Sequence, residues 1–225
     1  LSFYLLNTFF AVLSGIVMVL ITESKNFIAT NSEKILITAA GIFTIALTQF
    51  VIVPYDVSSY FFLLLFFYFF LKYLGESNNA NLIILAVIII ISTLNRESSA
   101  LSVSLAATLL FSKFGIKKES ILPVAVLGGT FVAVYLGMRF FNQSFTTNDG
   151  SLLLENFTQP KNYLGLLFWA VFLLFSLLIS KDRIAAKYNL LFHALSLPYI
   201  LMSFYSGILY EVRLYVPLFL TSLFL

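Results

Sequence analysis

Long apolar runs joined by short polar connections are the feature that most limits what this chain can fold into. A helix of about 20 apolar residues crosses the roughly 30 Å hydrocarbon core of a bilayer, so we expect about eight to nine spans here. The runs lack the alternation of apolar and polar residues that is typical of a membrane β-barrel. The expected fold is therefore an all-α, polytopic transmembrane helix bundle. Its expected spans are residues 1–22, 35–53, 58–72, 81–94, 98–111, 121–138, 163–180, 190–210 and a ninth that begins at Leu214.

Composition excludes the other broad classes of protein. The chain is 60% hydrophobic and 10% charged, with a mean hydropathy of +1.00. A soluble domain has about 25% charged residues, which it needs to cover its surface. A soluble fold, a disordered chain and a nucleic-acid binder with a basic patch are therefore excluded, and the bilayer is the expected partner. With no cysteine and no clustered acids, the sequence predicts no disulfide, metal site or cofactor.

Both ends of the sequence fall within apolar runs. The chain begins at Leu1 in the first expected span and ends at Leu225, in a run that is too short to cross a bilayer. The first run has no basic segment before it and no small-residue cleavage site after it, so a spanning helix is favoured over a signal peptide. We interpret residues 1–225 as a single transmembrane domain from a longer protein.

The stretch 80–111 is too long for one crossing. As a single helix it would extend ~48 Å, and it contains Asn95, Arg96 and Glu97, which cannot face lipid. Two short helices that meet at this tripeptide are the better interpretation. We therefore expect a broken or short helical hairpin around residues 81–111, with the tripeptide below the membrane surface and shielded by neighbouring helices.

Alternating spans sort the basic residues unevenly between the two sides of the membrane. Nine of the 13 fall on the side that follows the first span, and eight of those nine are Lys. The positive-inside rule makes this side cytoplasmic. The outer side holds Arg96, Arg139, Lys161 and Arg213. Because a guanidinium binds phosphate or carboxylate through a planar fork, we expect the functional site on the outer side and lysine anchoring on the inner side.

Three short motifs place acids at the outer ends of expected spans. They are Pro54-Tyr55-Asp56, Asn95-Arg96-Glu97 and Glu211-Val212-Arg213. Ionisable groups within a membrane are costly, which makes them functional candidates by default. A transferase that uses a lipid-linked phosphate donor needs a carboxylate to deprotonate the acceptor hydroxyl and cations to stabilise the leaving phosphate. The lipid tail would hold that donor at the depth of these motifs.

Each motif also has a purely structural interpretation. Asp56 could cap the helix that follows it. Arg96 and Glu97 could neutralise one another, or Glu97 could stabilise a helix N-terminus through the helix dipole. Glu211 and Arg213 are two residues apart, so on a helix they would point to different sides and need other partners, either the charges of the second motif or a ligand.

Polar residues outside the three motifs carry no assigned role in the reaction. His193 is expected to be a hydrogen-bonded histidine of the bundle, and Asn7 and Gln49 are expected to make interhelical hydrogen bonds. Asn142 and Asn156 begin N-x-[ST] sequences in the longest polar connection, a weak indication of glycosylation.

The three motifs together resemble those of bacterial multi-span proteins related to the GT-C class of glycosyltransferases. The resemblance rests on Tyr55-Asp56 at a hairpin, Asn95 to Ser98 in a broken apolar segment, and the run from Glu211 to Pro217. It implies a polyprenyl-phosphate sugar donor and a reaction on the periplasmic face of a bacterial inner membrane. In that class the principal catalytic acid usually lies in the first external loop, which would precede Leu1. The residues to which the resemblance extends are Asp56, Glu97 and Glu211 as catalytic acids, and Arg96, Arg213, Asn95 and Tyr55 as substrate-binding residues.

Two other functions, and a purely structural membrane subunit, are compatible with the sequence. A polysaccharide polymerase or ligase of the O-antigen type also uses outer arginines and lipid-linked sugars, commonly with a large external loop. A secondary transporter would place its site near the middle of the membrane on unwound helices, and the break at Asn95 fits that only superficially.

Overall fold

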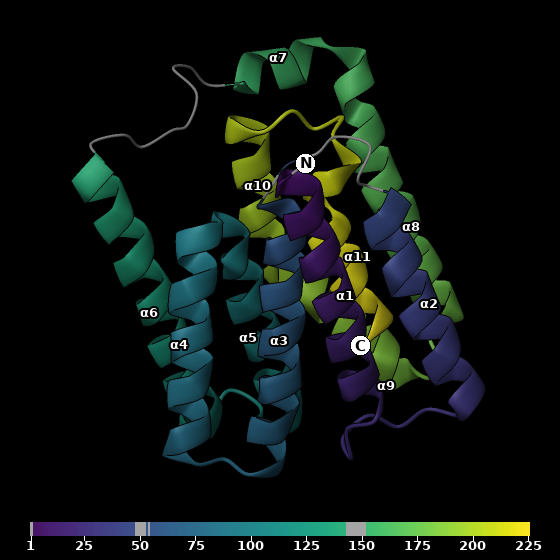
Figure 1. The fold of residues 1–225 in the computed structure, drawn as a ribbon, viewed down its shortest axis with the longest axis vertical. Coiled ribbons are helices and arrows are strands. Elements are labelled where there is room, and N and C mark those ends of the chain that lie inside the picture. The colour runs from purple at the N-terminus through teal and green to yellow at the C-terminus, as the bar shows by residue number, and fades with distance from the viewer. Residues whose placement is uncertain (1, 48–52, 54, 143–151) are drawn as a thin grey trace.

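The computed structural model describes residues 2–47, 53, 55–142 and 152–225. Within these ranges the chain forms helices and no strand, which confirms the all-α prediction (Figure 1). The long helices are α1 (Ser2–Thr22), α2 (Asn31–Leu47), α3 (Asp56–Gly75), α4 (Asn79–Asn95), α5 (Ala100–Phe114), α6 (Lys118–Asn142) and α8 (Tyr163–Ile179). The shorter elements are α7 (Leu153–Thr158), α9 (Arg183–Leu195), α10 (Leu197–Ser206), α11 (Val216–Leu223) and the 3-10 turns η1 (Glu97–Ser99), η2 (Pro160–Asn162) and η3 (Val212–Leu214).

Among the described residues, four helical stretches are both long and apolar enough to cross a membrane. They are Ser2–Thr22, Asp56–Gly75, Lys118–Phe141 and Pro160–Ile179. This is fewer than the sequence predicts, because α2, α4 and α5 are only 15 to 17 residues long and one apolar run is divided. The divided run is the expected span 190–210: it forms α9 and α10, which meet at Ser196, since Pro198 lies in the first turn of a new helix and cannot continue the old one.

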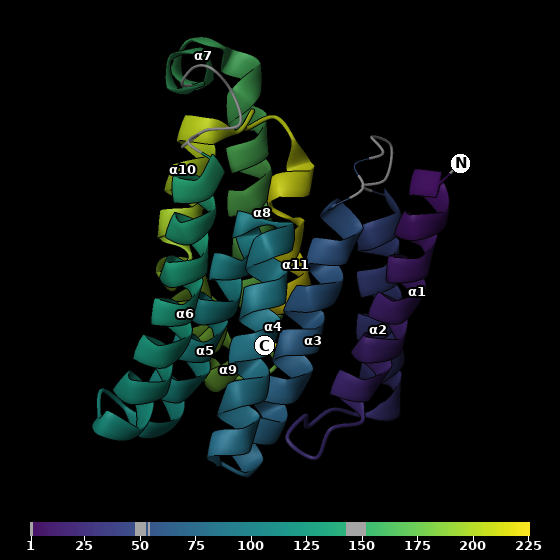
Figure 2. The same ribbon diagram turned by 60° about the vertical axis from the view of Figure 1, so that its left-hand side comes forward.

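Successive long helices run in alternating directions, so their termini gather at two ends of the bundle (Figures 1 and 2). We call one the arginine end: it contains the start of α3, the turn between α4 and η1, the end of α6, and η3. We call the other the lysine end: it contains the connections α1–α2, α3–α4, α5–α6 and α8–α9. This arrangement agrees with the sorting of charges that the sequence predicts.

Helix α3 forms the centre of the bundle. It packs against α1, α4, α5 and α11, and its side chains Tyr60, Phe66 and Phe70 are fully buried. The Phe66 and Phe70 rings stack with centroids 5.6 Å apart. Helix α6, in contrast, packs mainly against α4 and α5 and leaves much of its surface exposed. The central position of α3 puts its first residue, Asp56, in the middle of the arginine end.

The predicted break between residues 81 and 111 is confirmed. Helix α4 ends at Asn95, Arg96 adopts an extended conformation (φ −164°, ψ 144°), and η1 leads into α5. The Arg96 amide donates to Ser92 O at 2.8 Å. The hydroxyls of Thr93 and Ser99 lie 2.9 Å apart and close the turn. The chain therefore reverses direction at Arg96 and keeps its backbone hydrogen bonds satisfied there.

Candidate functional site

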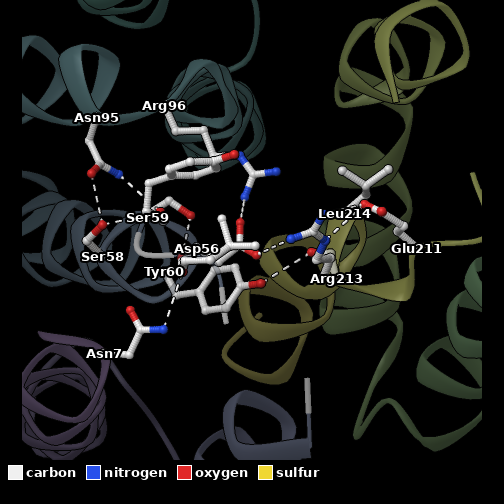
Figure 3. A network of polar contacts seen from close by, with 12 residues as sticks. Asn7, Asp56, Ser58, Ser59, Tyr60, Asn95, Arg96, Glu211, Arg213 and Leu214 are labelled. Carbon is white, nitrogen blue, oxygen red and sulfur yellow. Dashed lines mark hydrogen bonds and ion pairs between the residues drawn. The ribbon is translucent and has the colours of Figure 1, made fainter. Parts of the chain in front are cut away.

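A buried carboxylate joins the three sequence motifs. Asp56 is 2% exposed; its Oδ1 accepts a hydrogen bond from Arg96 Nη1, and its Oδ2 accepts one from Arg213 Nη1 at 3.1 Å (Figure 3). The arginines come from segments 40 and 157 residues away in sequence. Because Asp56 is the first residue of α3, the helix dipole also favours its negative charge.

The capping interpretation of Asp56 is wrong. The N-cap residue of α3 is Tyr55, and its side chain makes no capping hydrogen bond. Asp56 already lies in the first turn of the helix, so its carboxylate points to the two guanidinium groups instead of back to the helix amides. Its function in the fold is to hold distant segments together.

Arg213 and Glu211 pair with each other, contrary to the sequence prediction. Arg213 Nε and Nη2 donate to Glu211 Oε2 at 2.9 and 2.7 Å. The prediction assumed a helix through both residues, but Glu211 precedes η3 with φ −76° and ψ 95°. This extended backbone lets side chains two residues apart reach one another. Arg213 is therefore bound by carboxylates on two sides, Glu211 on one and Asp56 on the other.

Glu97 does not neutralise Arg96. Its Oε2 accepts a hydrogen bond from Arg139 Nη2 at 3.1 Å, at the end of α6. The side chain of Glu97 is 50% exposed and that of Arg139 is 13% exposed. Sequence analysis placed Arg139 on the outer side but did not select it as a site residue. The sequence feature that could have identified Arg139 is its position in the last turn of a long apolar helix.

Asn95 and Tyr55 connect the end of α4 to the start of α3. Asn95 Nδ2 donates to Tyr55 O at 3.3 Å, and Asn95 Oδ1 accepts from Ser58 Oγ at 2.8 Å. The Arg96 guanidinium lies over the Tyr55 ring, 5.5 Å from its centroid, an arrangement that favours a cation. Sequence analysis did not select Ser58, because a serine in an apolar run carries no distinctive signal.

A cavity of about 770 Å³ opens beside this network. Six of the seven predicted site residues line it, and Asp56 lies behind them. Arg139 lines the cavity beside Glu97, and Tyr199 and Met202 of α10 also line it. The predicted residues that line the cavity are Tyr55, Asn95, Arg96, Glu97, Glu211 and Arg213. The fold therefore brings the three motifs to one cavity.

A second cavity, of about 670 Å³, also contacts Glu211 and Arg213. Its other walls are mainly apolar side chains of α8, among them Leu164, Phe168 and Val171. At Gly165 a Cβ would overlap the backbone oxygen of Leu209, so only glycine permits this close approach of the 209–213 segment to α8. The Glu211–Arg213 pair thus lines both a charged cavity and an apolar one.

The charges of the site balance within the described residues. Three guanidiniums, from Arg96, Arg139 and Arg213, contact three carboxylates. The guanidinium of Arg96 makes a hydrogen bond only to Asp56 among the described residues, so its remaining N–H groups are available to a ligand in the cavity. No cluster of three or more potential metal ligands occurs in the described part of the chain.

Several secondary predictions can be compared with the structure. His193 is a hydrogen-bonded bundle residue, as predicted: it contacts Trp169 Nε1 at 3.0 Å and Ser222 Oγ at 2.8 Å. Asn7 Nδ2 donates to Val53 O at 3.3 Å, which links α1 to the segment before α3. Gln49, Pro54 and the residues that follow Asn142 in its N-x-S sequence lie outside the described residues.

Glycosylation of Asn156 is contradicted by its burial. The side chain is 0% exposed, and the Nδ2 atom that would carry a glycan donates to Phe204 O at 2.9 Å and to Gly207 O at 2.6 Å. Asn156 Oδ1 accepts from the Leu209 amide at 3.2 Å. This asparagine instead fixes the segment that leads to Glu211.

The site can bind an anion through its guanidiniums, and Glu97 and Glu211 offer carboxylates beside it. Both carboxylate oxygens of Asp56 accept hydrogen bonds from arginines and the side chain is buried, so Asp56 contacts the cavity through these arginines. Compared with known protein families, curated protein sequences and solved structures, the chain shows no match.

Proposed function

We propose that this chain is the membrane-embedded part of a glycosyltransferase-like protein that takes a sugar from a lipid-linked phosphate donor at the arginine end. The observation that carries the proposal is the cavity lined by Arg96, Arg139 and Arg213 and by the carboxylates of Glu97 and Glu211. The GT-C resemblance of the motifs supplies the reaction class. The apolar cavity along α8 offers a surface for the lipid part of the donor next to Arg213.

The proposed membrane topology has eight to nine crossings, as the sequence predicts. The shorter helices, such as α5 and the α9–α10 pair, would also cross the membrane, packed beside the long helices that flank them. The lysine end would face the cytoplasm, by the positive-inside rule. The arginine end would then face the periplasm of a bacterial inner membrane, at the depth of a lipid phosphate.

Arg96 is the proposed principal ligand of the donor phosphate. Its guanidinium has N–H groups that are not taken by protein acceptors, whereas Arg213 is occupied by two carboxylates. Charge-assisted hydrogen bonds to phosphate are strong and would stabilise the charge that develops on the leaving group. Asp56 would keep Arg96 in place as its counter-ion.

Glu97 is the proposed general base. It is the most exposed of the three acids, at 50% compared with 33% for Glu211 and 2% for Asp56. A base must reach the acceptor hydroxyl, and an exposed carboxylate at the cavity can do so. Arg139, which contacts Glu97 Oε2, would orient it. Glu211 would hold Arg213, and Tyr55 and Asn95 would support the wall of the cavity.

Binding of a polyprenyl monophosphate to the full-length protein in lipid nanodiscs tests the proposal. We expect saturable binding that weakens more than tenfold in Arg96→Ala, since hydrogen bonds to charged groups contribute about 1.5–3 kcal/mol. Arg96→Lys should recover only part of the loss, because Lys cannot bind bidentately. Lys72→Ala, at the lysine end, is the matched control and should bind normally. Absence of saturable binding by the wild-type protein would overturn the proposal.

Donor turnover separates the remaining functions. Consumption of lipid monophosphate sugars supports the transferase, whereas consumption of lipid diphosphate sugars alone supports a polymerase or ligase. Arg96→Ala and Arg213→Ala variants that keep sugar transfer but lose solute uptake would instead support a transporter.

A further inference from the structure

Two tyrosine hydroxyls from different helices hold the short turn that carries Arg213. Tyr60, on α3, donates to Arg213 O at 3.3 Å, and Tyr199, on α10, donates to Leu214 O at 2.9 Å. These are successive backbone carbonyls of η3. Tyr60 is 0% exposed, so its hydrogen bond is shielded from solvent. Two helices that are far apart in sequence thus hold one three-residue turn.

The turn lies just before α11 and is not held by the hydrogen bonds of that helix. Arg213 O precedes Tyr215, the N-cap residue of α11, so it accepts no α-helical hydrogen bond from α11. Tyr60 supplies a donor to that oxygen. A three-residue turn has few hydrogen bonds of its own, so side chains from outside must fix its position.

Helix α3 holds Arg213 at two points. Asp56 binds the guanidinium, and Tyr60, one helical turn later, binds the backbone carbonyl of the same residue (Figure 3). Residues four apart lie on the same face of a helix, which explains why both reach one target. Because the backbone and the guanidinium are both fixed, Arg213 stays between the charged cavity and the apolar cavity, which both contact it.

We propose that Tyr60 and Tyr199 are positioning residues: they fix η3 so that Arg213 meets the phosphate of the lipid-linked donor where the two cavities adjoin. This inference rests on the proposed function. The tyrosines do not need to touch the donor, because they act through the backbone of the turn.

The first measurement tests, without any ligand, how firmly the two tyrosines hold η3 in place. The 225-residue chain contains no cysteine, so Val212→Cys introduces a single thiol into it, and maleimide labelling reports how freely the turn moves. We expect Tyr60→Phe and Tyr199→Phe each to raise the labelling rate about fivefold, and the double variant more, since each removes one hydrogen bond. Tyr215→Phe is the matched control: Tyr215 is buried next to η3, and its hydroxyl has no partner among the described residues.

The second measurement compares ligands on variants that keep Val212. The probes are a polyprenyl monophosphate and the corresponding polyprenol, in nanodiscs. We expect the double variant to bind the monophosphate at least tenfold more weakly and the alcohol unchanged, because only the phosphate needs Arg213. A merely structural role would weaken both ligands or neither. Tyr215→Phe should bind both normally.

The outcomes distinguish the two proposals. Unchanged labelling in both phenylalanine variants overturns the anchoring role, whether or not the donor binds. Faster labelling with equal loss of monophosphate and alcohol binding overturns the positioning role. Faster labelling in a protein whose wild type binds no monophosphate retains the anchor and overturns the proposed function, and with it the role toward a donor. If the double variant fails to fold, the single Tyr199→Phe variant gives the same comparison.

Discussion

The two ends of the bundle use their charges in opposite ways. At the arginine end, Asp56 is 2% exposed and is bound by Arg96 and Arg213, each 17% exposed. At the lysine end, Glu23 is 64% exposed in its pair with Lys34, and Glu33 and Lys181 are 42% and 62% exposed. A buried charge that loses its partner is strongly destabilising, whereas exposed pairs contribute little. Burial therefore decides which charged residues the fold depends on.

The lysine end also differs in what its cations contact. Lys72 lies over the Tyr68 ring, 4.5 Å from the centroid, and Lys113 donates to Leu74 O at 2.6 Å. These are contacts within the bundle or at its edge, made by long flexible side chains whose charged groups reach toward water. No comparable network of shared carboxylates joins the described lysines. The charged residues therefore form a shared, buried network at the arginine end and separate contacts at the lysine end.

The largest effect that would test this comparison is expected at Asp56. Asp56→Asn removes the counter-ion of two partly buried arginines, and we expect a loss of about 3–5 kcal/mol in the free energy of unfolding. Glu23→Gln at the lysine end should change it by less than about 1 kcal/mol. Chemical unfolding in detergent, followed by circular dichroism, measures both. Equal losses in the two variants would contradict the contrast between the ends.

The next largest expected difference in the free energy of unfolding is between variants of two asparagines, one at each end of the bundle. Asn156 Nδ2 donates to two carbonyls of the segment near Glu211, so Asn156→Asp places a carboxylate against carbonyl oxygens. We expect a loss of about 2–3 kcal/mol, the cost of unsatisfied buried groups. Asn78, at the lysine end, caps α4 by accepting from the Asn81 amide at 2.8 Å, and Asn78→Ala should cost about 1 kcal/mol.

Thermal unfolding of these two variants in the same detergent gives the comparison. A smaller loss for Asn156→Asp than for Asn78→Ala would show that the segment before η3 is not held by Asn156. It would also weaken the view that the arginine end is the more tightly built one.

The smallest expected effect is the dependence of stability on pH at the lysine end. The backbone amide of Thr30 donates to Glu33 Oε2 at 2.6 Å and its hydroxyl at 3.0 Å. These hydrogen bonds, the backbone one first, lower the pKa of Glu33. Because the folded pKa lies below the unfolded value of about 4.3, the contribution of Glu33 to stability is fully present above that value and is lost as pH falls through the folded pKa.

Unfolding of the wild type and of Glu33→Gln between neutral and acidic pH measures this effect. The wild type should be slightly more stable at neutral pH, and the difference should disappear in acid. A difference that grows as the pH falls would have the wrong sign for a carboxylate stabilised in its charged form.

The site could be predicted in part from the residues. Acids and arginines at the ends of apolar runs are costly, so their presence identified the three motifs, and six of the seven predicted site residues line one cavity. Their pairing could not be predicted. The capping interpretation of Asp56 placed it before the helix, but it already lies in α3, and the interpretation of Glu211 assumed a helix where the backbone is extended.

Sequence by itself determined the helical class, the break at Arg96 and the division of charges between two ends, because hydrophobic runs and helix breakers act locally. Tertiary structure alone decided that Asp56 joins segments 40 and 157 residues away. It also decided that Arg139 forms an ion pair with Glu97, and that Tyr60 and Tyr199 hold η3. The physical reason is that a hydrogen bond or ion pair depends on which helix ends meet in space. Apolar packing sets that arrangement, and the sequence around the polar residues does not reveal it.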